Sequence, residues 1–157
     1  MKYVITGGAG FIGSNLVDEL VSQSHEVHVI DNFISGKKKN CNENARYHDI
    51  DIANVANLSI IKKVLNECDT VFHCAALARV QPSILNPIKY EINNTLGIMN
   101  MLKCSVDMDV RRFVYSASSS AYGSTKKLPS KESDKPNPIS PYANQKYYGE
   151  LCWKMFS

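Results

Sequence analysis

Tyr142 and Lys146 have the residue types and the spacing of an acid–base pair. Residues four positions apart share one face of a helix, so Lys146 would lie near the Tyr142 phenol or over a neighbouring ribose. A nearby ammonium group favours the phenolate and lowers a phenol pKa of about 10 toward the working pH. Such a tyrosine can act as a general base. The spacing is common, however, and an exposed helix face also explains it.

Hydroxyl groups are concentrated upstream of this pair, where residues 116–120 read SASSS. The run follows the apolar stretch 112–116, which is typical of a strand. Hydroxyls at the carboxyl end of a strand can hydrogen-bond a substrate oxygen. A serine-rich turn without a chemical role is the alternative.

A glycine-rich turn near the N-terminus could bind the phosphates of a dinucleotide. The sequence TGGAGFIGS, residues 6–14, follows the apolar run 2–5 and precedes a helix-like stretch at 15–21. Glycines in such a turn allow a left-handed backbone angle, a close approach of a pyrophosphate and tight helix packing, while the helix N-terminus offers N–H groups. They fit two registers, Gly7-x-x-Gly10-x-x-Gly13 and Gly8-x-Gly10-x-x-Gly13. A plain tight turn is the alternative to a dinucleotide site.

Asp31 directly follows the second apolar run. An acidic side chain at this place can accept both ribose hydroxyls of an adenosine and repels a 2′-phosphate, so Asp31 favours NAD over NADP. The basic run at residues 37–39 argues for NADP, but it lies further along the loop. A capping aspartate in a turn is the alternative.

Two further strand ends carry candidate cofactor contacts. Asp49 and Ile50 could hold an adenine, one by a hydrogen bond and one by packing, although Asp49 also fits an ordinary helix start. The small residues at Cys74, Ala75 and Ala76 would let the backbone approach the middle of the cofactor, or would only allow close strand–helix packing. Cys74 is expected to be an apolar thiol and not a nucleophile.

Strand-like and helix-like stretches that alternate along the chain would position these residues. We expect helices at 15–21, 54–67, 87–106 and 142–156, a loop at 117–140, and strands at 2–5, 25–30, 45–49, 70–74 and 112–116. This alternation predicts one α/β domain, residues 1–157, built on a doubly wound parallel sheet with helices on both faces. Ligands bind such a sheet beyond the carboxyl ends of its strands, where the strand order reverses.

The composition is that of a soluble globular protein, with 44% hydrophobic and 21% charged residues. It contains neither an apolar run long enough to cross a membrane nor a signal-like segment, so we expect a cytoplasmic protein without a membrane partner. The net charge of +3 is mild, and nucleic acid is not expected as a partner. The five cysteines form no Cys-x-x-Cys pair and are expected to be reduced thiols, with no metal site.

Taken in order, these motifs resemble the extended short-chain dehydrogenase/reductases, and among them the NAD-dependent nucleotide-sugar epimerase/dehydratase family. The resemblance covers essentially the whole chain and implies a Rossmann-type, NAD-binding domain. It rests on TGGAGFIG at 6–13, Asp31-Asn32, Asp49-Ile50, HCAA at 73–76, Asn93, SASSSAYG at 116–123 and PYANQK at 141–146.

The resemblance implies a role for each matching position. Tyr142 would be the catalytic base, and Lys146 would activate it and bind a ribose. Ser118 would be the third catalytic hydroxyl, because it lies four residues before Tyr122 of the Tyr-Gly pair. Asn93 would contact the cofactor from the long helix. The implied cofactor-binding set is Gly7, Gly10, Phe11, Ile12, Gly13, Asp31, Asn32, Asp49, Ile50, Cys74, Ala75, Ala76, Asn93, Tyr142 and Lys146.

The implied reaction is the C4 epimerisation of a UDP-sugar through a transient 4-keto intermediate. In family members of this kind, NAD⁺ takes a hydride from C4 while the tyrosine takes the hydroxyl proton, and the keto sugar is reduced again on its other face. The family's 4,6-dehydratases carry an Asp-Glu pair after the catalytic hydroxyl, whereas this chain has Ser119-Ser120. A dehydratase is therefore the less favoured alternative.

A second function class stays open because full-length family members are about twice as long. The resemblance implies that the last strands of the sheet and the sugar-binding region lie outside residues 1–157. We therefore expect an exposed edge at the fifth strand, weakened NAD binding and negligible turnover by this chain alone. The alternative to an epimerase is a non-catalytic module that binds NAD or dimerises, with helices 87–106 and 142–156 pairing in a homodimer.

Overall fold

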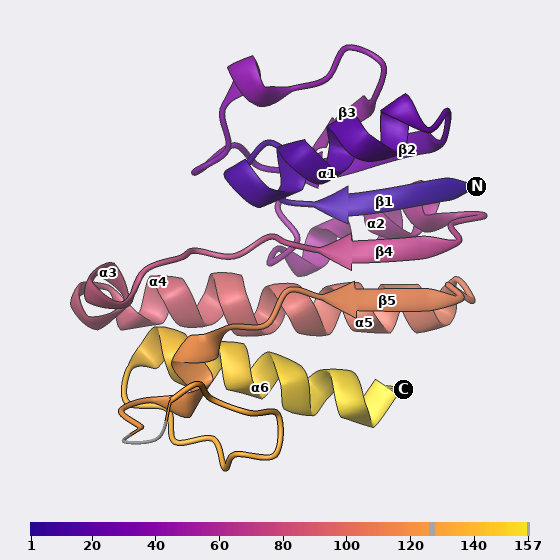
Figure 1. The fold of residues 1–157 in the computed structure, drawn as a ribbon. Coiled ribbons are helices and arrows are strands. Elements are labelled where there is room, and N and C mark those ends of the chain that lie inside the picture. Colours follow the sequence, from indigo (N-terminus) through magenta and orange to yellow (C-terminus); the bar gives the residue numbers. More distant parts are fainter. Residues whose placement is uncertain (126–127, 157) are drawn as a thin grey trace.

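A five-stranded parallel sheet forms the centre of the structure (Figure 1). The computed structural model describes residues 1–125 and 128–156. The strands are β1 (Lys2–Thr6), β2 (Glu26–Asp31), β3 (Arg46–Asp49), β4 (Thr70–His73) and β5 (Arg112–Tyr115). Their order is β3-β2-β1-β4-β5, and every neighbouring pair is parallel. The order reverses between β1 and β4, which confirms the doubly wound sheet and marks the crevice for a ligand.

Helices cover both faces of the sheet, as predicted. Figure 1 shows α1 on the near side, and α2 and α5 on the far side. The helix α6 packs against α5 and β5. The bounds of these helices are α1 (Phe11–Ser22), α2 (Leu58–Leu65), α5 (Gly97–Asp107) and α6 (Pro141–Phe156).

Alternate residues of the strands fill two hydrophobic layers. Ile5 and Val29 are fully buried and pack against Val17 of α1. Their neighbours Val4 and Ile30 point the other way, into the layer formed with α2 and α5. Strands buried on both faces carry continuous apolar runs, which is why β1 was recognisable in the sequence as a run without alternation.

The long helix predicted at 87–106 is three consecutive segments. These are α4 (Pro87–Glu91), a π-helical turn η3 (Ile92–Leu96) and α5. A short helix, α3 (Val80–Leu85), precedes them and was not predicted. Short 3₁₀ turns occur at η1 (Lys38–Asn40), η2 (Val55–Asn57) and η4 (Ser119–Tyr122), the last within the predicted loop. None of the helices in the described residues is long and apolar enough to cross a membrane.

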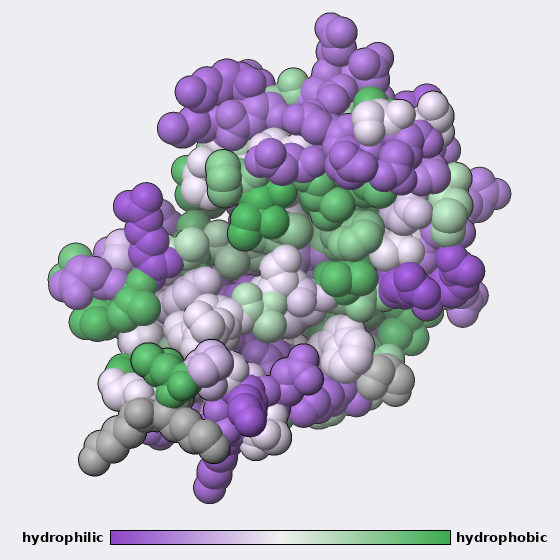
Figure 2. All heavy atoms as spheres, in the orientation of Figure 1, coloured by the Kyte–Doolittle hydropathy of each residue, from purple (hydrophilic) through white to green (hydrophobic). Residues whose placement is uncertain are grey.

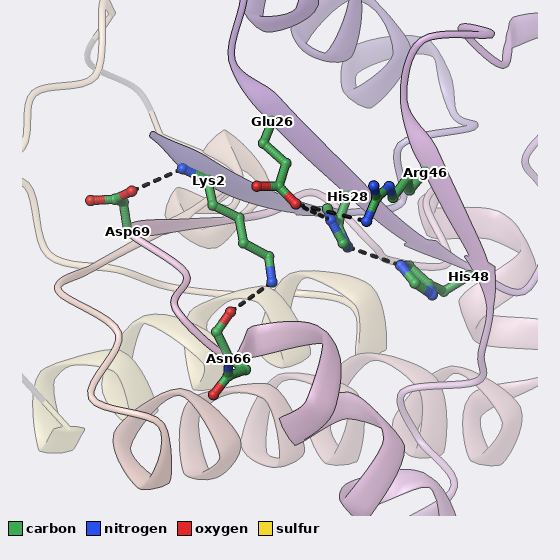
Figure 3. A network of polar contacts seen from close by, with 7 residues as sticks. All are labelled: Lys2, Glu26, His28, Arg46, His48, Asn66 and Asp69. Carbon is green, nitrogen blue, oxygen red and sulfur yellow. Dashed lines mark hydrogen bonds and ion pairs between the residues drawn. The ribbon is translucent and has the colours of Figure 1, made fainter.

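A polar network lies near the amino ends of the strands, away from the crevice (Figure 3). His28 Nε2 is 2.9 Å from Glu26 Oε1, and His28 Nδ1 is 3.1 Å from His48 Nε2, so this chain of contacts ties β2 to β3. The Lys2 backbone N–H donates to Asp69 Oδ2 at 2.9 Å. Burial and the neighbouring His28 lower the pKa of His48 below its usual value. These contacts join neighbouring parts of the sheet and leave its ligand end free.

β5 is the other edge strand of the sheet, as expected. The indole N–H of Trp153 donates to the Phe113 carbonyl of this strand at 3.0 Å. Val114 is 39% exposed, and Figure 2 shows hydrophobic residues gathered in the middle of the face that carries α1. The part of the chain that the structure describes places no helix over β4 and β5 on this face (Figure 1).

Candidate functional site: a dinucleotide pocket and the adjoining helix α6

A pocket of about 300 Å³ lies beyond the carboxyl ends of β1, β2 and β4. This is the crevice where the strand order reverses. The volume lies at the lower end of the range for ligand sites. The pocket brings together twelve of the predicted cofactor residues: Gly7, Gly10, Phe11, Ile12, Gly13, Asp31, Asn32, Ile50, Cys74, Ala75, Ala76 and Asn93.

The glycine turn is so compact that side chains would fill or distort it. Gly7 has a φ of +72°, and a Cβ atom there would lie 2.8 Å from the Ala75 backbone. A Cβ atom on Gly13 would overlap the Gly7 carbonyl oxygen. Gly10 is the N-cap of α1, and its N–H donates to the Gly7 carbonyl at 3.0 Å. The turn therefore presents bare backbone to the pocket, as the binding of a pyrophosphate requires.

The start of α1 is open toward the pocket. In the described residues no side chain caps this helix and its first turn holds no acidic residue. Phe11 and Ile12 line the pocket and are 85% and 66% exposed. The uncapped N–H groups and the positive end of the helix dipole suit an anionic group.

Asp31 is held at the pocket by two backbone amides. It is buried, with Oδ2 accepting the Ala9 N–H at 2.9 Å and Oδ1 accepting the Phe33 N–H at 2.8 Å. A carboxylate has about four acceptor sites, so positions are left for two ribose hydroxyls. The lysines at residues 37–39 are exposed and do not line the pocket, although the Lys37 N–H donates to the Ala9 carbonyl at 3.0 Å.

At the end of β3 the structure places one predicted residue in the pocket and another outside it. Ile50 is buried and lines the pocket, whereas Asp49 is exposed and Asp51 lines the pocket instead. The pocket lining also includes six residues that the sequence did not predict: Ile30, Ile34, Ser35, Ile52, Leu77 and Ala78. Most of these residues lie within a predicted strand or soon after it. A search of the three or four residues that follow each predicted strand would have found most of them.

The residues after β4 form one wall of the pocket, and hydrogen bonds to buried side chains hold this wall in place. The Ala75 N–H donates to Thr6 Oγ1 at 3.2 Å, and Thr6 Oγ1 lies 3.0 Å from His73 Nδ1. His73 is buried, and burial followed by the charge of Lys146 lowers its pKa to about 3. A neutral imidazole therefore supports this wall. Cys74 Sγ lies 3.4 Å from Ser116 Oγ, at the boundary between this pocket and the end of β5.

Tyr142 and Lys146 lie near the start of α6, outside the pocket lining. Lys146 is buried; its Nζ donates to the Ser116 carbonyl at 2.5 Å and lies 4.3 Å from the centre of the Tyr115 ring. Burial lowers the pKa of Lys146 to about 8. The Tyr142 N–H donates to Ser83 Oγ at 3.1 Å, which anchors the first turn of α6 to α3.

Ser118 lies at the start of η4, which packs against α6. Its hydroxyl is 2.8 Å from Ser120 Oγ and accepts the Ser120 N–H at 3.3 Å. The hydrogen bonds among the described residues do not join the side chains of Ser118, Tyr142 and Lys146 to one another. The fold brings the three residues to one end of α6 without closing them into a bonded triad.

Asn93 and Asn94, which the sequence does not distinguish, face different environments. Asn93 lines the pocket, and its side chain donates to the Lys89 carbonyl at 2.8 Å. Asn94 is buried, and its side-chain oxygen accepts the Leu77 N–H at 2.8 Å. Gln145, also buried, bonds to Asn94. No periodicity or motif in the sequence signals this buried amide pair.

Comparison with known proteins agrees with this geometry. The model of the NAD dependent epimerase/dehydratase family matches residues 3–156. The chain belongs to this family. The glycine turn, the strand-end residues and α6 all fall within the matched stretch, so the sequence motifs and the pocket are features of an epimerase/dehydratase domain.

Several relatives within the family are UDP-sugar epimerases. UDP-glucose 4-epimerase of Lactobacillus helveticus is 37% identical over 98% of this chain and 47% of its own length. A structure of UDP-glucose 4-epimerase from Thermotoga maritima with UDP-glucose has a TM-score of 0.94 at 36% identity and covers 99% of this chain and 51% of that one. The Thermus thermophilus UDP-glucose 4-epimerase in complex with NAD has a TM-score of 0.90 at 31% identity, covering 99% and 50%. The chain thus spans about half the length of the relatives it matches.

Proposed function

We propose that this chain is the NAD-binding half of a nucleotide-sugar 4-epimerase, which inverts C4 of a UDP-sugar through a transient 4-keto intermediate. One observation carries the proposal. The pocket joins a bare glycine turn, an uncapped helix start and a buried aspartate, and the helix with Tyr142 and Lys146 lies next to its wall.

The residues present fit NAD. The backbone around Gly10 and the start of α1 would hold the pyrophosphate, and Asp31 would accept the adenosine ribose hydroxyls. Ile50 would pack on the adenine. The same carboxylate would repel the 2′-phosphate of NADP, and the lysines of residues 37–39 do not line the pocket. When bound, NAD supplies a reversible two-electron oxidation at the sugar C4.

The residues of α6 would handle the proton. The Tyr142 phenolate would take the proton of the C4 hydroxyl during oxidation and return it during reduction. Lys146 has three N–H donors. Among the described residues one of them donates to the Ser116 carbonyl, so the others are available to the phenol or to a ribose. Ser118 would hydrogen-bond the same substrate oxygen once its hydroxyl turns away from Ser120.

The proposal also names the nucleotide, the assembly and the compartment. A uridine nucleotide is proposed because relatives at 36–37% identity are UDP-glucose 4-epimerases. A homodimer is supported by large apolar side chains that are exposed on α3, α4, η3 and α6: Ile84, Leu85, Ile88, Ile92, Leu151 and Met155. Five free cysteines fit a reducing compartment, so we place the protein in the cytoplasm.

A non-catalytic NAD-binding or dimerisation module is the second candidate function. It is favoured by the Ser118 hydroxyl, which bonds within its own turn. A 4,6-dehydratase has less support, because Ser119 and Ser120 offer no carboxylate for the elimination of water.

The test adds the half of the relatives that residues 1–157 do not span. Residues 1–157 are fused to the C-terminal half of the Thermotoga maritima epimerase, and the conversion of UDP-galactose to UDP-glucose is measured with NAD. We expect conversion, and a loss of about 10²-fold or more in the Tyr142→Phe fusion, since general-base catalysis contributes that much. A fusion that binds NAD but converts no UDP-sugar would favour the non-catalytic module.

A further inference from the structure

A buried chain of side-chain hydrogen bonds connects the wall of the dinucleotide pocket to α6. It begins at Leu77, which lines the pocket. Asn94 holds both backbone groups of Leu77: its Oδ1 accepts the N–H at 2.8 Å and its Nδ2 donates to the carbonyl at 3.1 Å. Asn94 is 5% exposed, so this two-point contact is shielded from water.

The backbone beyond Leu77 needs such support. Arg79 has a φ of 83°, a region that non-glycine residues rarely occupy. The Tyr90 hydroxyl donates to the Ala78 carbonyl at 2.7 Å and holds the same segment from α4. Strained backbone persists only where the surrounding structure fixes it. Here Asn94 and Tyr90 bond to the two residues that precede Arg79.

Gln145 sets the orientation of Asn94. It is 2% exposed, and its Oε1 accepts a hydrogen bond from Asn94 Nδ2 at 3.0 Å. Its Nε2 donates to Glu91 Oε2 at 3.1 Å. Because Glu91 takes the donor of the amide, the acceptor must face Asn94. The Asn94 amide thus gives one N–H to Gln145 and the other to Leu77.

Gln145 also lies between Tyr142 and Lys146 in α6, while Asn94 lies in the π-helical turn η3. π-helical turns occur frequently at functional sites. Neither Gln145 nor Asn94 lines the dinucleotide pocket, whereas Leu77 does. Hydrogen bonds through Leu77, Asn94 and Gln145 therefore connect the pocket wall to the helix that carries the candidate base.

We propose that Gln145 is a positioning residue that, through Asn94, sets the pocket wall at Leu77 relative to α6. The inference rests on the proposed NAD site and extends it. In this proposal the hydrogen bonds hold the wall at Leu77, beside the middle of NAD, at a fixed position relative to α6. Loss of Gln145 then weakens NAD binding from a distance, because Asn94 becomes free to release Leu77.

The primary experiment compares Gln145→Ala with Asn144→Ala, its exposed neighbour in α6. Affinities for NAD and AMP are measured by calorimetry on the 157-residue chain. AMP reports only the adenosine end, near Asp31 and Ile50. We expect Gln145→Ala to weaken NAD by about tenfold, the effect of losing one buried hydrogen bond. AMP affinity stays within about twofold, and Asn144→Ala changes neither.

A rescue variant separates positioning from general packing. Gln145→Glu places a second carboxylate against Glu91 and weakens NAD binding. The addition of Glu91→Gln restores a donor–acceptor pair at this contact and recovers most of the affinity. On an Asn94→Ala background, Gln145→Ala causes no further loss, because its path to Leu77 is already cut.

Hydrogen exchange of the Leu77 amide gives a readout that needs no NAD. We expect its exchange to accelerate at least tenfold in Gln145→Ala and to be unchanged in Asn144→Ala. Equal losses of NAD and AMP affinity, or unchanged NAD affinity with unchanged Leu77 exchange, would overturn the positioning role alone. A wild-type chain that binds no NAD would overturn the proposed function, and the positioning role with it.

Discussion

At the residue scale, Lys146 shows a conflict between function and stability. The side chain is buried, and its ammonium has one backbone acceptor and one aromatic ring as neighbours. Burial lowers its pKa to about 8, so the folded protein disfavours the charged form. A structural role alone would be served better by an apolar side chain, which supports the assignment of Lys146 to the chemistry of the site.

We predict that Lys146→Met stabilises the chain at pH 7. A free lysine has a pKa of about 10.4, so between pH 8 and that value the unfolded state binds more protons and the stability of the wild type rises with pH. The burial penalty is therefore largest below pH 8. The substitution also removes the hydrogen bond to the Ser116 carbonyl, which offsets part of this effect. The net increase in the free energy of unfolding at pH 7 is on the order of 1 kcal/mol.

Urea unfolding of both proteins at pH 7 and pH 10 checks this prediction. The difference in unfolding free energy should shrink at the higher pH, where the wild-type lysine is neutral when folded. Lys63→Met, at an exposed position of α2, is the control and should show no such trend. A Lys146→Met protein that is less stable than the wild type at pH 7 would contradict the burial argument.

Residue types predicted most of the pocket but not its details. Gly7, Gly13 and Asp31 were identifiable because few side chains meet their steric and charge requirements. Asp49 and Asp51 were not separable, since only the course of the chain after β3 decides which carboxylate lines the pocket. Asn94 was missed for a related reason: its role depends on the backbone of Leu77, a residue distant in the sequence.

At the scale of elements, the glycine turn after β1 packs very closely against α1. A Cβ atom on Gly13 would overlap the Gly7 carbonyl, so the turn and the helix cannot approach this closely with any larger residue. Gly97 in α5 is more tolerant, because a Cβ atom there would meet only the Ile52 side chain, at 3.2 Å.

We predict that Gly13→Ala lowers the free energy of unfolding by about 1–3 kcal/mol, the range for overpacked sites. It should also weaken NAD binding, because the turn must widen. Gly97→Ala is the matched control and should cost less than half as much. Thermal unfolding with and without NAD provides both measurements. Equal effects from the two substitutions would argue against a close contact between the glycine turn and α1.

Element types were predictable where the hydrophobic period was long or the strand was buried. The segment 87–106 carries a continuous apolar stripe, and that stripe conceals the π-helical turn η3 within it. The helix α3 has six residues and includes Pro82, so it is too short for a periodic signal. Both of these elements carry a residue that supports the site: Asn94 bonds to Leu77, and Ser83 bonds to Tyr142.

At the scale of the whole molecule, large apolar side chains are exposed on α4, η3 and α6. Ile88 is 75% exposed on α4, and its neighbour Lys89 is exposed on the same helix. We predict that the chain is a homodimer through this surface and that Ile88→Glu shifts it to the monomer. Lys89→Glu should leave the dimer intact.

Sedimentation velocity at micromolar concentrations measures this equilibrium. Because Ile88 is exposed, the substitution should leave the fold unchanged, and circular dichroism verifies this. A wild-type chain that sediments as a monomer throughout would contradict the dimer, while the NAD site within each chain would be unaffected by that result.

We propose that residues 1–157 hold an NAD site that is separable from Tyr142, the candidate base. The most direct measurement is a calorimetric titration of NAD into the wild-type chain, Gly10→Val and Tyr142→Phe. We predict that the wild type binds NAD, that Gly10→Val abolishes binding by filling the phosphate cradle, and that Tyr142→Phe keeps nearly all the affinity. Equal losses in both variants, or no binding by the wild type, would contradict the account.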